Sequence, residues 1–340
     1  MSTAPSSALE SGQASAAAAG KKDLSVRLDA ARRAAIWVLL AAELLLFSLL
    51  LPNFLTLSNI TNVVVNSSGL AIVAAAMTFV IILGCIDVSV GSMLGVLAWV
   101  TGWLTTTQDL PVLAVLGLVI ALGAVMGTLN GTIVAKGRMT AIIATLGMLF
   151  VWRSVLYGLW GGRDLFAPPV APWLGGQRIG VFPVVGLIAL AVFVVLGLIS
   201  LYRRFGRDVF AVGNDRQAAR LNGIPVDRRI IGAFALLGAL VGLAAAMQMA
   251  RVGVVQAFSG RDFELGVIAA VLIGGTSITG GRGSLAGTLG GVLFVAVLQN
   301  GIVLAGVPPL WNGVALGAFI LIAVGADVLL ARASGTEVKL

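Results

Sequence analysis

Histidine is absent from the 340-residue sequence, and Cys85 is its single cysteine. Histidine is the commonest metal ligand and the usual general base near neutral pH, and a disulfide or thiolate zinc site needs more than one cysteine. No G-x-x-x-x-G-K-[ST] phosphate-binding loop occurs either. We therefore expect no enzyme, no metal site and no cofactor in this chain. If ATP and Mg²⁺ drive its function, a separate ATPase must bind them.

Charged residues are also scarce, at 11% of the chain, whereas 59% of the residues are hydrophobic. Soluble domains carry about 25% charged residues. Since a membrane-spanning helix needs about 20 apolar residues, the apolar content is enough for roughly ten spans. The composition excludes an ordinary soluble enzyme and predicts an all-α, polytopic membrane helical bundle.

Prolines fall mostly between apolar runs, where they end helices. The apolar runs form one transmembrane domain, 34–330. A largely disordered cytoplasmic tail, 1–33, is expected before it, and a C-terminal cytoplasmic tail, 331–340, after it. The second and third spans, on either side of residues 84–91, also fit one broken element. The ten predicted spans are 34–51, 66–84, 90–106, 112–135, 140–158, 181–201, 230–249, 264–279, 284–306 and 310–330.

The formal charge of +8 is explained by membrane topology. Cytoplasmic loops are enriched in Lys and Arg. With ten spans and both termini in the cytoplasm, most of the 22 Lys and Arg residues lie inside, seven of them in segment 202–229. We therefore expect contact with the lipid bilayer and no nucleic-acid partner.

Glycine is abundant, with 44 residues. Glycines spaced four residues apart along a helix let helix backbones approach closely in lipid. The alternative is that thin helix faces allow the helices to rock against one another, and spacing alone does not separate these interpretations. Two sets recur at every fourth position: Gly123, Gly127 and Gly131, and then Gly283, Gly287 and Gly291.

Polar side chains within apolar spans are costly in lipid and mark functional sites. Asp87 lies between two apolar runs, where it either caps a broken helix or lines a polar pathway. Arg153 and Glu264 are potential ion-pair members, and Glu43 is either buried or part of a proton relay. The Asn and Thr candidates also suit structural hydrogen bonds between helices. The candidates for a pathway that follow from these polar side chains are Asn66, Asp87, Ser89, Asn130, Thr145 and Asn300.

Segment 202–229 is the only sizeable cytoplasmic loop that we expect. A short helix over residues 215–221 is predicted within it, because Asn222-Gly223 followed by Pro225 is a stop pattern. Its arginines suit a solvated loop beside anionic lipid. Its mixture of small, apolar and charged residues equally suits docking against a protein partner.

Four blocks of sequence resemble the permease subunits of the ribose/xylose/galactose-type ABC sugar importers, within a larger group that includes branched-chain amino-acid permeases. The similarity covers about residues 50–330. Residues 84–92, GCIDVSVGS, are similar to the signature G-x-I-D-[LV]-S-V-G-S of that family. The other blocks are 127–131 (GTLNG) with 144–148 (ATLGM), 205–207 (FGR) with 211–213 (AVG) and 218–224 (AARLNGI), and 268–277 (IAAVLIGGTS) with 280–284 (GGRGS) and 287–288 (GT).

The resemblance implies a permease in the bacterial inner membrane that works by alternating access and pairs with a second copy or a paralogue. It also implies a cytoplasmic ABC ATPase, which binds ATP and Mg²⁺, and an extracytoplasmic binding protein that delivers a monosaccharide. The loops 159–180 and 250–262 are expected to face the binding protein. The resemblance also makes the regions of Asp87 and of Thr276 and Ser277 candidates for shaping the translocation pathway. The segment 202–229 becomes the ATPase-coupling loop, with these residues at or near the interface: Arg207, Gly213, Ala218, Ala219, Arg220 and Gly223.

Other functions remain open at this point. A permease of the same group could carry branched-chain amino acids or another small polar solute. An ion-coupled secondary transporter could use Asp87, Glu43 or Glu264, whereas the coupling-loop match argues against a membrane scaffold. Sugar permeases of this kind often carry an aspartate where this chain has Gly266, and this departure puts a charge-based role at that position in doubt.

Overall fold

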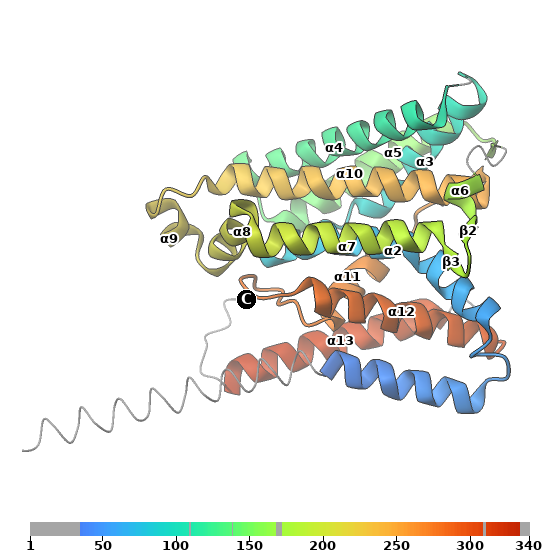
Figure 1. Ribbon diagram of the computed structural model, residues 1–340. Coiled ribbons are helices and arrows are strands. Elements are labelled where there is room, and N and C mark those ends of the chain that lie inside the picture. The colour runs from blue at the N-terminus through green and yellow to red at the C-terminus, as the bar shows by residue number, and fades with distance from the viewer. Residues whose placement is uncertain (1–34, 109, 138, 168–171, 309–310, 334–340) are drawn as a thin grey trace, which may run out of the picture.

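The computed structural model describes residues 35–108, 110–137, 139–167, 172–308 and 311–333. The chain folds almost entirely into helices (Figure 1). Two pairs of very short antiparallel strands join loops at one end of the bundle: β1 (Leu165–Phe166) with β4 (Val254–Val255), and β2 (Arg178–Ile179) with β3 (Phe182–Pro183). After a first helix, Ala35–Leu50, the helices are α2 (Leu57–Ile82), α3 (Val90–Thr106), α4 (Val112–Lys136), α5 (Ala141–Trp160), α6 (Pro172–Gly175), α7 (Val184–Tyr202), α8 (Arg204–Asn214), α9 (Arg216–Leu221), α10 (Val226–Val252), α11 (Phe263–Ile273), α12 (Leu285–Leu304) and α13 (Trp311–Ala333).

Six described helices are long and apolar enough to cross a membrane: α2, α4, α5, α7, α10 and α12. Each coincides with a predicted span, although α2 begins nearer the N-terminus than predicted because Thr56 caps it by accepting a hydrogen bond from the Asn59 N–H. The remaining predicted spans correspond to shorter apolar helices, namely Ala35–Leu50, α3, α11 and the described part of α13. The helical, multi-span prediction is confirmed, while ten spans and cytoplasmic termini stay predictions.

The predicted span 264–279 is wrong in its length. Helix α11 has 11 residues, or about 16 Å at 1.5 Å per residue, which is roughly half of a bilayer core of about 30 Å. The chain leaves the helix at Gly274 and turns at Gly275, whose φ is +87°. The predicted C-terminal tail, 331–340, also begins inside a helix, because α13 extends to Ala333. The predicted tail 1–33 lies outside the described residues.

Helix α2 is the central element of the bundle. All of its residues from Ala71 to Ile82 are buried, and it packs against α10, α12, α7, α11 and α8. A helix that is apolar on every face needs protein or lipid on every face. Its C-terminal end, where the chain breaks before α3, is therefore enclosed by protein.

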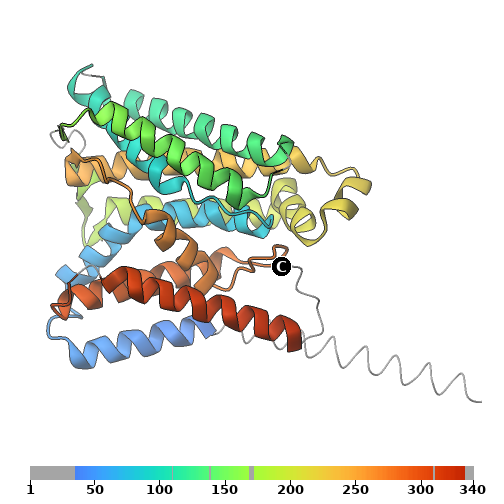
Figure 2. The same ribbon diagram turned by 180° about the vertical axis from the view of Figure 1, so that it is seen from behind.

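The first glycine set packs α4 against α10, and the two helices lie side by side in both views (Figures 1 and 2). A Cβ on Gly127 would overlap the carbonyl oxygen of Phe234 and lie 3.1 Å from the Gly238 Cα. A Cβ on Gly123 would overlap the Gly238 carbonyl oxygen. Gly131 likewise faces α10, at Ile231 and Phe234. The geometry is the one expected from close backbone packing.

The second glycine set is not one helix face. Gly287 and Gly291 do lie in α12, where an added Cβ would overlap the carbonyl oxygens of Gly274 and Ala270 at α11. Gly283, in contrast, precedes the helix, because Ser284 caps α12 by accepting a hydrogen bond from the Gly287 N–H. A Cβ on Gly283 would lie 2.8 Å from the Thr276 side chain.

Helices α8 and α9 lie at one end of the bundle, and α6 with β2 and β3 lies at the opposite end (Figure 1). Helix α9 confirms the short helix predicted over 215–221. Helix α8 was not expected from the sequence. Its signal is the spacing of Phe205, Val209 and Val212, which puts apolar side chains on one face.

Candidate functional site

The break between α2 and α3 contains Asp87, whose carboxylate is enclosed by hydrogen bonds. Gly84 turns the chain with a φ of +69°, which glycine adopts without steric cost. Asp87 Oδ1 accepts hydrogen bonds from the Ser89 N–H at 2.8 Å and the Ser89 hydroxyl at 2.6 Å. Asp87 Oδ2 accepts one from Asn130 Nδ2 at 3.1 Å. Because both Asp87 and Ser89 are buried, this geometry favours the capping interpretation over free exposure to a pathway.

Side chains from α4 and α5 complete this arrangement. Asn130 on α4 also donates to the Ser89 hydroxyl oxygen at 2.7 Å. Thr145 on α5 accepts from the Val88 N–H at 3.3 Å and donates to the Ile86 carbonyl at 3.1 Å. Both side chains are fully buried. Four predicted candidates thus form one group, here called the break cluster: Asp87, Ser89, Asn130 and Thr145.

The Thr145 hydroxyl is expected to stabilise the break cluster. Thr145→Val keeps the shape of the side chain but leaves the Val88 N–H and the Ile86 carbonyl without a partner, at a cost of about 1–3 kcal/mol for each unpaired group. We expect faster amide hydrogen exchange at residues 86–88 and a lower unfolding temperature in detergent. Thr145→Ser keeps the hydroxyl and is the matched control. Equal exchange in the Val and Ser variants would contradict this role.

The two remaining asparagine candidates lie elsewhere in the bundle. Asn300 on α12 forms a reciprocal pair with Asn59 on α2, in which each amide nitrogen donates to the other side-chain oxygen at 2.9 Å. Asn66 on α2 accepts a hydrogen bond from Arg251 on α10. Each bond joins two helices, as the structural interpretation expects. The predicted candidates therefore do not line a single site.

The intramembrane charges do not form the suggested ion pair among the residues that the structure describes. Arg153 donates to the Ser259 carbonyl at 2.9 Å. Glu264 packs against Gly91 at the start of α3, and its Oε2 atom is buried without a partner in the described part of the chain. Both carboxylate oxygens of Glu43 are also buried, with no hydrogen-bond partner among described residues.

The loop between β4 and α11 reaches into the bundle. A Cβ on Gly95 of α3 would lie 2.7 Å from the Ser259 carbonyl oxygen, so this loop touches a helix that begins at the break. The start of this loop, at Gln256, is held by Asp164. The Asp164 carboxylate accepts hydrogen bonds from Gln256 Nε2 and Trp160 Nε1, each at 3.0 Å. These two bonds, Gln256 first, lower the pKa of the Asp164 carboxyl. The carboxylate therefore stays charged and anchors the loop near neutral pH.

At the other end, α9 is defined by its caps. Asp215 Oδ1 accepts from the Gln217 N–H at 2.8 Å and the Ala218 N–H at 3.0 Å, and Gly223 ends the turn with a φ of +76°. Ala218 and Arg220 are exposed, whereas Ala219 is buried. Arg207 on α8 is also exposed. The predicted coupling residues thus include both an outward face and positions that fix the segment to the bundle.

Helices α8 and α9 contact the end of α2 directly. The Gly281 N–H donates to the Ile82 carbonyl at 2.8 Å. A Cβ on Gly213 would overlap that same carbonyl oxygen and lie 2.7 Å from the Gly281 nitrogen. Arg216 Nη2 donates to the Leu83 carbonyl at 2.9 Å. We call these five residues the junction; it links the exposed α8–α9 segment to the chain just before the break cluster.

Thr276 and Ser277 lie beside the junction. The Ser277 N–H donates to the Arg282 carbonyl at 3.0 Å, within the turn that also carries Gly281. Thr276 is buried, and its hydroxyl has no partner among the described residues. These two candidates therefore lie in the connection between α11 and α12.

Sequence reasoning missed two arginines that the structure singles out, Arg216 and Arg251. No local motif marks Arg216, because its partner Leu83 lies 133 residues away. Arg251 had a usable signal. It stands in the last turn of a long apolar helix, and arginine within a membrane span is a functional-site candidate by default.

A bundle of long apolar helices, broken inside the protein and tied there to an exposed helical segment, has the architecture of a multi-pass membrane permease. Residues 59–338 match the family described as branched-chain amino acid transport system / permease component. The chain belongs to this family, and it is a multi-pass protein of the bacterial inner membrane.

Curated relatives cover most of the chain. The ribose import permease protein RbsC of Escherichia coli K12 is 36% identical over 291 residues, or 82% of this chain and 88% of the relative. The probable ABC transporter permease protein YphD of the same strain is 40% identical over 87% of this chain and 90% of its own length. The galactose/methyl galactoside import permease protein MglC of Escherichia coli K12 is 31% identical over 86% of this chain and 93% of its own length. No solved structure gives a significant match. The family resemblance expected from the four blocks is confirmed.

Proposed function

We propose that this chain is the permease subunit of an ABC importer and forms the transmembrane pathway for a monosaccharide. One observation carries the proposal, namely that ribose and galactose import permeases align with more than four fifths of the chain. An extracytoplasmic binding protein delivers the sugar, a separate ATPase subunit binds ATP and Mg²⁺, and two permease copies or paralogues pair in the membrane. The ten-span topology with cytoplasmic termini belongs to this proposal.

The α8–α9 segment is the part that meets the ATPase. Its exposed positions Arg207, Ala218 and Arg220 face away from the bundle, while Gly213 and Arg216 hold it to the end of α2. Movement of this segment displaces the junction, and the chain connects the junction to the break cluster within a few residues. Coupling between sites requires an element that both sites can bias, and the broken α2–α3 segment supplies it.

A second candidate is a permease for branched-chain amino acids, which the family description favours. Reconstitution of the chain with its ATPase and binding protein in proteoliposomes separates the candidates. We expect ATP-dependent uptake of a monosaccharide, tested with D-ribose and D-galactose, and no uptake of L-leucine. An ion gradient without ATP is expected to drive no uptake by the chain alone.

Two results would overturn the assignment. ATP-dependent uptake of L-leucine with no uptake of either sugar would favour the amino-acid permease. Solute movement by the purified chain alone, driven by an ion gradient, would instead identify a secondary transporter. The ATP-free proteoliposome is the control for leakage in the first case, and a proteoliposome without an ion gradient is the control in the second.

A further inference from the structure

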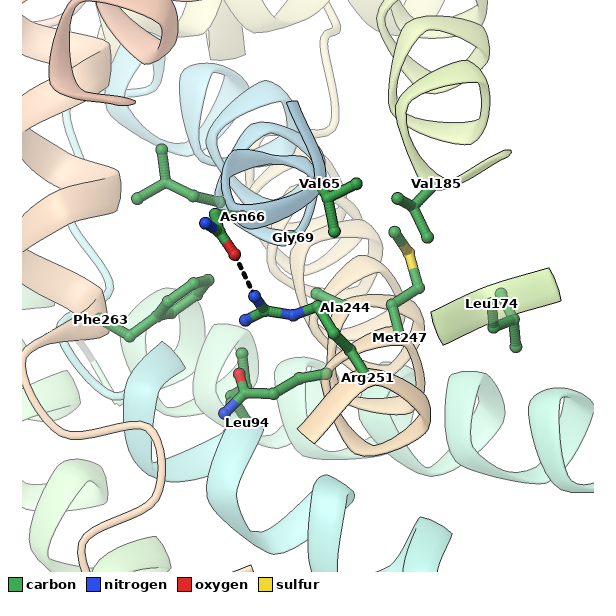
Figure 3. Close-up of a pocket in the computed structure, with 12 residues that line it drawn as sticks. Val65, Asn66, Gly69, Leu94, Leu174, Val185, Ala244, Met247, Arg251 and Phe263 are labelled. Atoms are coloured by element: carbon green, nitrogen blue, oxygen red, sulfur yellow. Dashed lines mark hydrogen bonds between the residues drawn. The ribbon is translucent and has the colours of Figure 1, made fainter. Parts of the chain in front are cut away.

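A cavity of about 160 Å³ is lined by residues of α2, α3, α6, α7, α10 and α11 (Figure 3). Helix α6 places it toward the end of the bundle opposite α8 and α9 (Figure 1). Most of its wall is apolar, and three polar side chains line it: Asn66, Gln248 and Arg251. An apolar cavity of about 150 Å³ in another protein accepts one benzene molecule. The space is therefore that of one six-membered ring.

Arg251 is the strongest polar group of this cavity. Its guanidinium lies between Asn66 and Phe263 and donates a hydrogen bond to Asn66 Oδ1 (Figure 3). No carboxylate in the described part of the chain lies within ion-pair distance of Arg251. A guanidinium has five N–H donors, so most of its hydrogen-bonding capacity stays available to a bound molecule.

Gln248 adds a second kind of polar contact. It stands three residues before Arg251 on α10, a spacing that puts both side chains on one helix face. Its amide makes no hydrogen bond to any residue that the structure describes, although it lines the cavity. An amide both donates and accepts, as do the hydroxyl groups of a sugar. Phe263 supplies an aromatic ring for the apolar face of such a ligand.

We propose that this cavity binds one neutral monosaccharide ring within a single permease chain, with hydroxyl oxygens accepting from Arg251 and hydroxyl groups pairing with Gln248. The inference rests on the proposed function and assigns a site to its substrate. An amino acid fits less well, because its ammonium group needs an acceptor charge and no Asp or Glu is among the residues that line the cavity.

Gly69 allows the cavity to be filled without disturbing the backbone. It lies in α2 and lines the cavity, and an added Cβ would meet only the Ala244 Cβ, at an ordinary distance of 3.8 Å. Gly69→Val therefore places two further methyl groups in the region of the ligand. Gly147→Val in α5 is the matched control, because nothing lies within 4 Å of a Cβ at that position.

Binding is measured on the full-length chain in lipid nanodiscs by the shift of its thermal unfolding with millimolar D-ribose, D-galactose or L-leucine. We expect at least one of the two sugars to stabilise the protein and leucine to have no effect. Arg251→Gln and Gln248→Leu are expected to weaken sugar binding about tenfold or more. Gly69→Val is expected to abolish it, while Gly147→Val binds as the wild type does.

ATP-dependent uptake by the complete transporter distinguishes failure of the cavity as the sugar site from failure of the proposed function. If the wild type transports sugar but Arg251→Gln, Gln248→Leu and Gly69→Val leave binding and transport unchanged, the cavity is not the site and the proposed function stands. If the wild type transports neither sugar but does transport leucine, the proposed function itself fails. Loss of both binding and transport in the three folded variants, with Gly147→Val unaffected, supports the site.

Discussion

Replacing Gly213 with alanine is expected to uncouple transport while leaving the protein in the membrane. The new methyl group overlaps the Ile82 carbonyl oxygen and crowds the Gly281 N–H that this carbonyl accepts. Overpacking of this kind costs about 1–3 kcal/mol, which lowers the equilibrium constant for forming the intact junction about 5- to 150-fold. Uptake per ATP hydrolysed, measured in proteoliposomes with the ATPase and binding protein, is expected to fall as the intact junction is depopulated.

Two further variants make this prediction specific. Gly197→Ala in α7 adds the same methyl group where nothing lies within 4 Å, and it is expected to transport normally. Arg216→Ala removes the bond to the Leu83 carbonyl without adding volume, so it is expected to act in the same direction as Gly213→Ala and more weakly. Normal coupling in Gly213→Ala, at normal expression, would refute the role of the junction.

Replacing Gly127 with valine is expected to give the largest loss of stability. The valine Cβ overlaps the Phe234 carbonyl oxygen and lies 3.1 Å from the Gly238 Cα, so α4 and α10 must separate. We expect a cost of about 3 kcal/mol or more, at the upper end of overpacking effects. The measurements are the unfolding temperature in detergent and the yield of monodisperse protein.

Gly117→Val is the control in the same helix. A Cβ at Gly117 meets nothing within 4 Å, so this variant carries the same loss of glycine and the same valine without the clash. It is expected to unfold near the wild-type temperature. Similar losses in both variants would mean that helix propensity, and not the contact with α10, limits stability.

Some boundaries followed from local sequence signals. The predicted span 90–106 coincides with α3, and the predicted helix 215–221 differs from α9 only in its first residue, which is the N-cap Asp215. Caps and glycines with positive φ depend on a few neighbouring residues, so sequence reasoning finds them. The start of α2 was missed because its N-cap, Thr56, precedes a polar first turn, where the apolar pattern is weak.

The length of α11 and the presence of α8 were harder to predict. The predicted span ran to residue 279, yet the helix ends at Ile273, where Gly274 packs against Gly287 of α12 and Gly275 turns the chain. Helix α8 is short and rich in charge, and its apolar face is buried only because the bundle covers Val209 and Val212. Both elements therefore have local signals, but these are short, and packing against the bundle stabilises the observed structure.

The sequence by itself determined that this protein is a helical membrane permease, where its main helices lie, that the chain breaks near Gly84, and which family it resembles. Apolar runs, helix stops and motif blocks carry that information in neighbouring residues. Only the tertiary structure decided which polar groups meet. Asp87 accepts a hydrogen bond from Asn130, which is 43 residues away in the sequence, and Arg251 donates one to Asn66, which is 185 residues away. Helix packing fixes which helix faces come together, and backbone contacts at glycines such as Gly127 set that packing.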